Sequence, residues 1–291
     1  MPIVSMKEIL EDAEKKKYAV GCYNAIDLQM TRGILEAAEE EKSPVILCHA
    51  ELHFKYTPLE KISYILVNEA KAAKAPVAIL LDHGNSFSAI IKAIHFGFNA
   101  VMFDGSQLSF EENVKQTKEI VKIANQLGVS VEGELGRVAR PKSGGAEGTE
   151  DDSIIYDKSL YTDPDKAVEF VERTGIHALT VAFGTVHGIY LDKPKLDLER
   201  LNKIKRITKV PLVMHGGSGL NARDYSNSIA NGISKINYYT NMALKAAQTV
   251  KEKLNNSPGN LFYHDLMMWS IETFKEEVRK TIKLFGSNNK A

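Results

Sequence analysis

The chain has 291 residues, of which 44% are hydrophobic and 25% are charged, a composition typical of globular proteins rather than disordered ones. Basic and acidic residues number 37 each, so the formal net charge is zero. A chain without a basic excess is poorly suited to neutralise a nucleic-acid backbone or an anionic membrane. We therefore expect a small-molecule substrate, and neither nucleic acid nor membrane as a partner.

The two cysteines, Cys22 and Cys48, lie in apolar runs that read as neighbouring buried strands. Such thiols are usually small core residues and not a disulfide, so a reducing cytoplasm is the expected compartment. Residues 1–5 contain no apolar leader segment, and no later apolar run reaches the length of a membrane span. We expect a soluble protein without a membrane anchor.

Eight short β-rich runs alternate with amphipathic helical segments along the chain. The runs cover residues 19–23, 44–48, 76–81, 100–103, 129–134, 178–182, 211–214 and 235–237. Apolar residues recur at helical spacing over residues 29–41, 59–74, 111–127, 165–174 and 198–208. Eight such units favour a closed (β/α)8 TIM barrel over a doubly wound sheet, whose G-x-G-x-x-G fingerprint is missing after the first run. We expect a single domain over residues 1–291.

Two segments depart from this alternation. The loop over residues 136–160 is rich in glycine, serine and acidic residues and is longer than a plain connection requires. A helical extension is expected over residues 257–291, ending in a helix over residues 270–285.

Polar clusters follow four of the predicted strands, where the active site of such a barrel forms. They are Asp82-His83-Gly84, Glu132-Gly133-Glu134, the run from Gly184 to Gly188 that contains His187, and the run from His215 to Gly219. Each histidine alone is weak evidence, because a lone imidazole at a strand end is more often structural. Three imidazoles converging on one rim, with an open fourth position, instead indicate catalytic zinc.

The other five histidines do not share this placement. We interpret His95, His177 and His264 as structural. His49 and His53 flank Glu51 in the order H-x-E-x-H, which differs from the metalloprotease motif H-E-x-x-H, so we assign them at most to the pocket wall.

The glycine run 216–219 can present several backbone N–H groups to a phosphate. It follows the seventh strand, and residues 237–240 follow the eighth, where many barrels bind phosphate. Asp82 has two open interpretations: it orients a metal-bound imidazole, or it acts as a general acid/base toward the substrate. Glu147 and Glu150 fit either a solvated acidic loop or a mobile lid that delivers a carboxylate.

Four motifs resemble those of the class II fructose- and tagatose-bisphosphate aldolases. They are L-D-H-G at 81–84, V-E-G-E-L-G at 131–136, G-T-V-H-G at 184–188 and H-G-G-S-G at 215–219. The likeness covers essentially the whole chain and includes the ending F-G-S-N-N-K-A at 285–291.

The resemblance implies zinc on His83, His187 and His215, with Glu134 accompanying an alternative metal position. It implies that Asp82 exchanges the proton of the substrate hydroxyl, and that Glu150, with Glu147 in reserve, takes the proton from the donor ketose. It also implies a dihydroxyacetone phosphate site, often with a monovalent cation (Na⁺ or K⁺) nearby, formed by Asn24, Gly188, Gly216, Gly217, Ser218, Asn237, Tyr238, Tyr239 and Thr240. The family forms homodimers and homotetramers.

Three positions depart from the bisphosphate pattern: Ala50 where a serine is common, Tyr239 where an aspartate or a small residue is common, and Ile271 near an expected arginine. Because arginine is best suited to a bidentate grip on phosphate, we hypothesise an altered acceptor aldehyde unless Lys275 or Arg279 compensates. Two rival functions remain open. A zinc-dependent barrel hydrolase would use the same ligands but usually carries H-x-H, which is absent here. A non-catalytic sugar-phosphate-binding barrel would not need Asp82, Glu150 and all three zinc ligands together.

Overall fold

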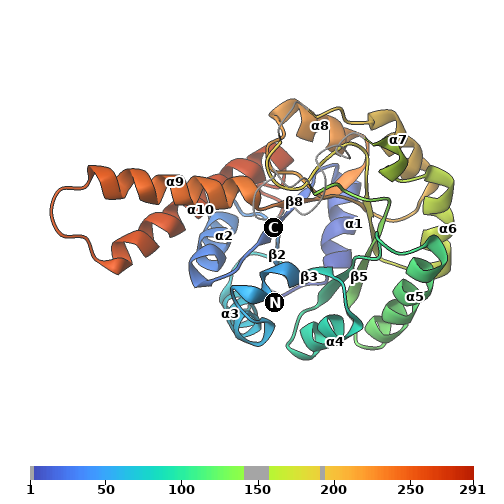
Figure 1. Cartoon of the computed structure of the whole chain (residues 1–291), viewed down its shortest axis with the longest axis horizontal. Helices are drawn as coiled ribbons and strands as arrows, with labels where there is room; N and C mark the ends of the chain where they lie inside the picture. Colours follow the sequence, from blue (N-terminus) through green and yellow to red (C-terminus); the bar gives the residue numbers. More distant parts are fainter. Residues whose placement is uncertain (1–2, 141–156, 191–193) are drawn as a thin grey trace.

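The computed structural model describes residues 3–140, 157–190 and 194–291. Eight parallel strands close into a barrel in chain order, and helices alternate with them around the outside (Figure 1). This confirms the predicted (β/α)8 barrel. The strands are β1 Val20–Asn24, β2 Val45–Ala50, β3 Val77–Gly84, β4 Ala100–Phe103, β5 Ser130–Leu135, β6 Ala178–Val181, β7 Leu212–Met214 and β8 Ile233–Tyr238.

Several helices begin at a residue whose side chain accepts a backbone N–H, as Ser86, Ser109 and Asp163 do. The helices are α1 Met6–Lys16, α2 Leu28–Glu40, α3 Leu59–Ala72, α4 Phe87–His95, α5 Phe110–Gln126, α6 Pro164–Thr174, α7 Leu198–Ile207, α8 Ala222–Ala230, α9 Thr240–Asn256 and α10 Tyr263–Phe285, with short 3-10 turns η1 Glu51–Lys55 and η4 Lys158–Leu160. Among these helices, none is both long and apolar enough to cross a bilayer.

Strand residues alternate between two cores. One set packs outward against the helices, and the other fills the barrel interior together with Met6, Leu10 and neighbouring residues of α1. Cys22 and Cys48 belong to the interior core, and both thiols are free and buried, which agrees with the expectation of reduced core cysteines. Since α1 packs on residues near the beginnings of the strands, the opposite end of the barrel holds the inward-facing polar positions.

Helices α9 and α10 form a hairpin arm that projects beyond the barrel (Figure 1). At its base α10 packs so closely on α2 that a Cβ added at Gly33 would lie 2.6 Å from the Cβ of Phe274. The helix expected to begin at residue 270 in fact begins at Tyr263. Its first turns carry exposed Tyr263 and Met268, so they lack the buried apolar face by which a helix is recognised in the sequence.

Candidate metal centre and active site

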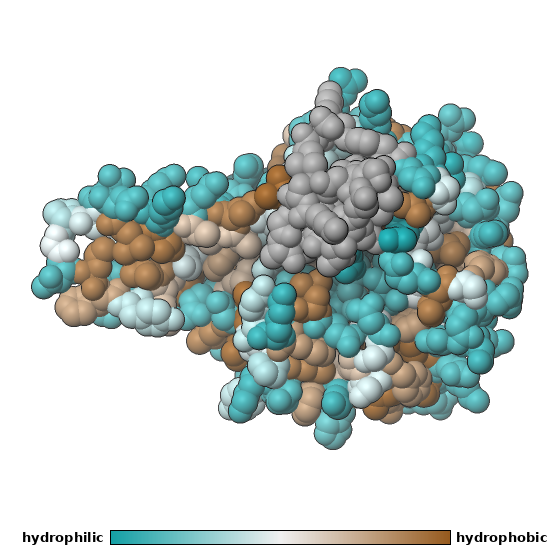
Figure 2. All heavy atoms as spheres, in the orientation of Figure 1, coloured by the Kyte–Doolittle hydropathy of each residue, from teal (hydrophilic) through white to brown (hydrophobic). Residues whose placement is uncertain are grey.

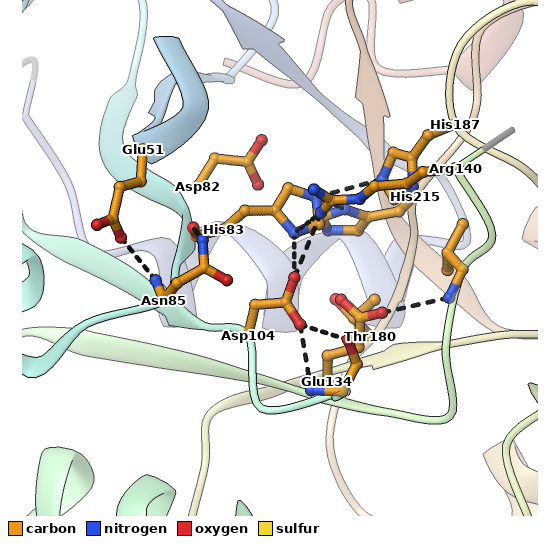
Figure 3. A network of polar contacts seen from close by, with 12 residues as sticks. Glu51, Asp82, His83, Asn85, Asp104, Glu134, Arg140, Thr180, His187 and His215 are labelled. Atoms are coloured by element: carbon orange, nitrogen blue, oxygen red, sulfur yellow. Dashed lines mark hydrogen bonds and ion pairs between the residues drawn. The ribbon is translucent and has the colours of Figure 1, made fainter. Parts of the chain in front are cut away.

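Three imidazoles converge at the C-terminal end of the barrel (Figure 3). His83 belongs to β3, His187 to the loop after β6, and His215 directly follows β7. The Nε2 atom of His83 lies 3.2 Å from Nε2 of His187 and 2.9 Å from Nδ1 of His215. All three side chains are buried. Closure of the barrel therefore brings His83 together with two residues that lie more than a hundred positions further along the chain.

These three nitrogens form a group able to hold a metal ion. Nitrogen ligands at about 2.0–2.1 Å from a tetrahedral zinc would lie roughly 3.3 Å apart, close to the separations found here. Burial lowers the pKa of His187 and of His215, so both rings are neutral near pH 7, and neutral imidazole is the form that binds metal. The donor set fits a catalytic zinc site with a position open for substrate.

Neighbouring strand residues normally point to opposite faces, yet Asp82 and His83 both line the pocket. The backbone explains this, because His83 has a φ of 46° and the pairing of β3 with β4 shifts register between Leu81 and Gly84. A non-glycine residue in the left-handed region costs roughly 1 kcal/mol or more and is typical of functional sites. The local distortion turns His83 toward the other two histidines.

Two of the three imidazoles have a buried carboxylate behind them. Nδ1 of His83 lies 2.8 Å from Oδ2 of Asp104, and Nε2 of His215 lies 3.1 Å from Oε1 of Glu132. Each carboxylate can fix the tautomer that leaves the opposite ring nitrogen facing the centre. Nδ1 of His187 is buried, and no hydrogen-bond partner for it occurs within the described parts of the chain.

Glu132 sits in a fully buried polar network inside the barrel. Its Oε2 accepts from Nζ of Lys235 at 2.8 Å, and its Oε1 accepts from the Thr180 hydroxyl at 2.7 Å. Glu132 and Lys235 both have 0% exposure. Burial alone would raise the pKa of Glu132, but the charge of Lys235 and the hydrogen bond from His215 outweigh it and lower that pKa to about 2. Glu132 is therefore an ionised anchor for His215.

Asp82 is held by two asparagines from the neighbouring strands β1 and β8. Nδ2 of Asn24 donates to its Oδ2 at 2.8 Å, and Nδ2 of Asn237 donates to its Oδ1 at 3.0 Å. Although burial opposes ionisation, electrostatic interactions with His83, His215 and Lys235 lower the pKa of Asp82 to about 2. The carboxylate is thus ionised, oriented and on the pocket wall, as a proton acceptor must be.

The pocket beside the histidines brings together every residue predicted to bind substrate. Its described lining also includes Ala50, Leu52 and Arg140; the predicted members are Asn24, Gly188, Gly216, Gly217, Ser218, Asn237, Tyr238, Tyr239 and Thr240. Gly216 has a φ of 66°, and a Cβ there would lie 2.3 Å from the Val186 carbonyl oxygen. Only glycine lets this turn pack against the loop that carries His187.

The three positions that depart from the bisphosphate pattern of the family fall into two groups. Ala50 and Tyr239 line the pocket, whereas Ile271 is buried in α10 against α2 and is not part of the lining. Lys275 is paired with Glu40 and Glu272. Arg279 is likewise paired, with Glu40, Glu41 and Glu276. Neither cation replaces an arginine in the described pocket.

His53 lies behind Tyr239, with ring centroids 4.8 Å apart. The ring nitrogens of His49 face the backbone carbonyls of Ala25 and Thr57. Both histidines support the wall without belonging to the described lining. His95 and His264 are exposed, and Nδ1 of His177 accepts the N–H of Val131.

Glu134 belongs to a second possible metal group, with His83 and Asp104. Burial, reinforced by the charge of Asp104, raises the pKa of Glu134. The predicted loop residues Glu147 and Glu150 lie outside the described residues.

Sequence reasoning missed three residues of the centre: Asp104, Lys235 and Arg140. Asp104 directly follows an apolar strand, so the rule that found Asp82 applies to it as well. Lys235 is a lysine inside a predicted strand, which is a signal for a buried ion pair. Arg140 follows an irregular segment, so no periodic pattern in the sequence predicts its contact with His83.

Replacing Lys235 with methionine should leave the Glu132 carboxylate buried without its counter-charge. Removing one partner of a buried ion pair costs about 3–5 kcal/mol, so we expect Lys235→Met to lower the free energy of unfolding by that order in urea denaturation with chelator present. The double variant Glu132→Gln/Lys235→Met removes both charges and should recover at least half of the loss. Equal losses in the single and double variants would contradict the ion-pair account.

Comparisons with known proteins agree with this geometry. The family model described as fructose-bisphosphate aldolase class-II matches residues 4–290. A probable fructose-bisphosphate aldolase of Bacillus subtilis is 42% identical over the whole of both chains, and a fructose-bisphosphate aldolase of Staphylococcus aureus is 41% identical over the whole of both. The crystal structure of the YdjI aldolase from Escherichia coli K12 aligns with a TM-score of 0.85 at 36% identity, covering 99% of each chain.

Family membership over the whole chain favours an aldolase over the two rival functions, a zinc-dependent barrel hydrolase and a non-catalytic sugar-phosphate-binding barrel. It also favours a metal-dependent reaction over one that proceeds through a lysine Schiff base. The chain belongs to the class II fructose-bisphosphate aldolase family and is a carbon–carbon lyase.

Proposed function

We propose that this enzyme is a zinc-dependent aldolase that reversibly cleaves a ketose 1-phosphate or 1,6-bisphosphate to dihydroxyacetone phosphate and an aldehyde. The observation that carries the proposal is the convergence of His83, His187 and His215 beside the oriented carboxylate of Asp82. We further propose that residues 1–291 act as one domain in a reducing cytoplasm, a compartment consistent with the two free buried thiols.

The three histidines would hold the zinc ion, which supplies Lewis-acid polarisation of the ketose carbonyl. Asp82 accepts the proton of the substrate hydroxyl during cleavage and returns it during synthesis, since Asn24 and Asn237 fix both of its oxygens. Glu150, or Glu147 in its place, is proposed as the base that exchanges the proton of the donor ketose. Glu134 is proposed to serve an alternative metal position with His83.

The phosphate of the donor is proposed to bind between the glycine turn after β7 and the beginning of α9. Gly216 and Gly217 bring backbone close to the pocket, and the Ser218 hydroxyl accepts the N–H of Tyr239. Helix α9 begins at Thr240 on the pocket wall, and a helix N-terminus attracts anions through its N–H groups and dipole. A Na⁺ or K⁺ ion near this phosphate stays a prediction from the family resemblance.

The acceptor end of the pocket supports a substrate without a second phosphate. Among the lining residues that the structure describes, Arg140 is the only lysine or arginine, and it already contacts Asp104 and His83. Relatives at 41–42% identity are named for fructose bisphosphate. The proposed difference from such a substrate lies in its aldehyde half, where a second phosphate would need a basic partner. We propose an acceptor aldehyde that is nonphosphorylated or carries a carboxylate.

Removal of the metal should abolish cleavage. We expect chelation to lower the release of dihydroxyacetone phosphate about a thousandfold, because metal Lewis acids contribute several kcal/mol to such reactions, and zinc to restore it. The matched control is Asp82→Asn, which should retain bound zinc yet lose about 10²–10⁴-fold in kcat/KM. Cleavage that persists in excess chelator refutes the metal mechanism.

Substrate preference can be measured directly. We expect kcat/KM for a ketose 1-phosphate with an uncharged far end to exceed that for fructose 1,6-bisphosphate and tagatose 1,6-bisphosphate by at least about tenfold, which corresponds to about 1.4 kcal/mol. The physical reason is that an unpaired phosphate dianion would be desolvated at the far end of the pocket. A strong preference for either bisphosphate is incompatible with the altered acceptor.

The helical arm supports assembly into a homodimer or homotetramer. Figure 2 shows hydrophobic residues gathered along the arm. Its exposed large hydrophobic residues include Leu254 at 43% exposure, Phe262 at 62%, Tyr263 at 76% and Met268 at 54%. Exposed apolar surface gathered on one projecting element marks an association site. We propose that the arm of one subunit packs on another copy of the chain.

Polar substitution on the arm should therefore weaken assembly. We expect Tyr263→Ser/Met268→Ser to shift the protein toward monomer in light scattering at micromolar concentration, because two apolar contacts are lost. The control is Tyr64→Ser, on α3, where the tyrosine is also 76% exposed. If both variants keep the molecular mass of the parent protein in solution, the arm is not the interface.

A further inference from the structure

Arg140 occupies a position that the proposed reaction does not explain. Its Nη2 lies 2.8 Å from Nδ1 of His83 and donates to Oδ2 of Asp104 at 3.3 Å. Figure 3 shows the side chain extending across the histidines toward these two atoms. The Arg140 side chain is 22% exposed and that of Asp104 is 7% exposed, so the contact is formed largely away from solvent.

The backbone holds Arg140 in this place. The preceding residue, Ala139, pairs with Val186, and its carbonyl accepts the N–H of His187. The loop after β5 is thus fixed to the segment that carries a proposed zinc ligand. Arg140 reaches the centre from a defined point.

The atoms that Arg140 contacts belong to the second possible metal group. The ligand atoms of His83, Asp104 and Glu134 all lie within 4.8 Å of one another. Glu134 is 1% exposed, and its Oε2 has no hydrogen-bond partner within the described parts of the chain. One imidazole and two carboxylates form a suitable donor set for a divalent cation, so the group itself does not prevent a second ion from binding.

We propose that the guanidinium of Arg140 takes the place of a second cation and thereby restricts this centre to one divalent ion at a time, held by His83, His187 and His215 or at the alternative position of Glu134. The inference rests on the proposed zinc centre. Arginine is always charged, and two cations a few ångströms apart in a buried site repel each other strongly. Arg140 also neutralises Asp104 locally, so that carboxylate remains a partner of His83 rather than a ligand of another ion.

The test is the zinc stoichiometry of the full-length protein, measured by equilibrium dialysis with elemental analysis and by calorimetric titration of the chelator-treated chain with Zn²⁺. The parent should bind one zinc per chain. Arg140→Ala and the larger neutral variant Arg140→Gln should each bind a second, weaker zinc. Arg140→Lys keeps the charge and should bind one. Arg140→Ala/Glu134→Gln lacks a ligand of the second group and should also return to one.

Several outcomes overturn the inference. A second zinc on the parent means that Arg140 does not exclude it, and a single zinc on both neutral variants means that the charge is irrelevant. A raised KM in Arg140→Gln with unchanged stoichiometry would make Arg140 a substrate-binding residue instead. A parent that binds no zinc refutes the zinc centre itself, and this inference with it, which separates that failure from the others.

Discussion

Three imidazoles meet at the mouth of the barrel, and the arrangement of the whole site follows from this contact. His83, His187 and His215 come from three different strand ends, so their contact exists only when the barrel is closed and in register. Burial lowers the pKa of His187 and of His215, which favours the neutral form that binds metal. Strand residues and α1 together fill the barrel interior on the side away from the histidines. The polar residues of the site occupy the inward-facing positions nearer the C-terminal ends of the strands.

The three proposed ligands are supported unequally by the residues behind them, and this asymmetry organises the site. His215 rests on Glu132, which is tied to Lys235 deep in the barrel, while His83 rests on Asp104 near the rim, with Arg140 beside it. Strand β8 serves both halves of the proposed chemistry, because Lys235 anchors the Glu132 network and Asn237 orients Asp82. The proposed metal ligation and the proposed proton transfer therefore depend on the same strand.

Much of this could be predicted from the sequence, because barrel strands are short apolar runs and their polar ends converge by topology. All eight predicted runs coincide with strands, and the nine residues expected to bind substrate line one pocket. The sequence could not show that His83 turns inward beside Asp82, since that depends on a register shift and a positive φ. Nor could it find Arg140 or the early beginning of α10, because loop contacts and exposed apolar helix turns lack a periodic pattern.

We propose that one zinc ion binds where these histidines meet. Anomalous diffraction at the zinc absorption edge, on crystals grown from zinc-loaded protein, locates the ion. We expect an anomalous peak at bonding distance, about 2.0–2.1 Å, from Nε2 of His83, Nε2 of His187 and Nδ1 of His215. A peak bound by other residues, or no peak between the three rings at full zinc loading, would contradict it.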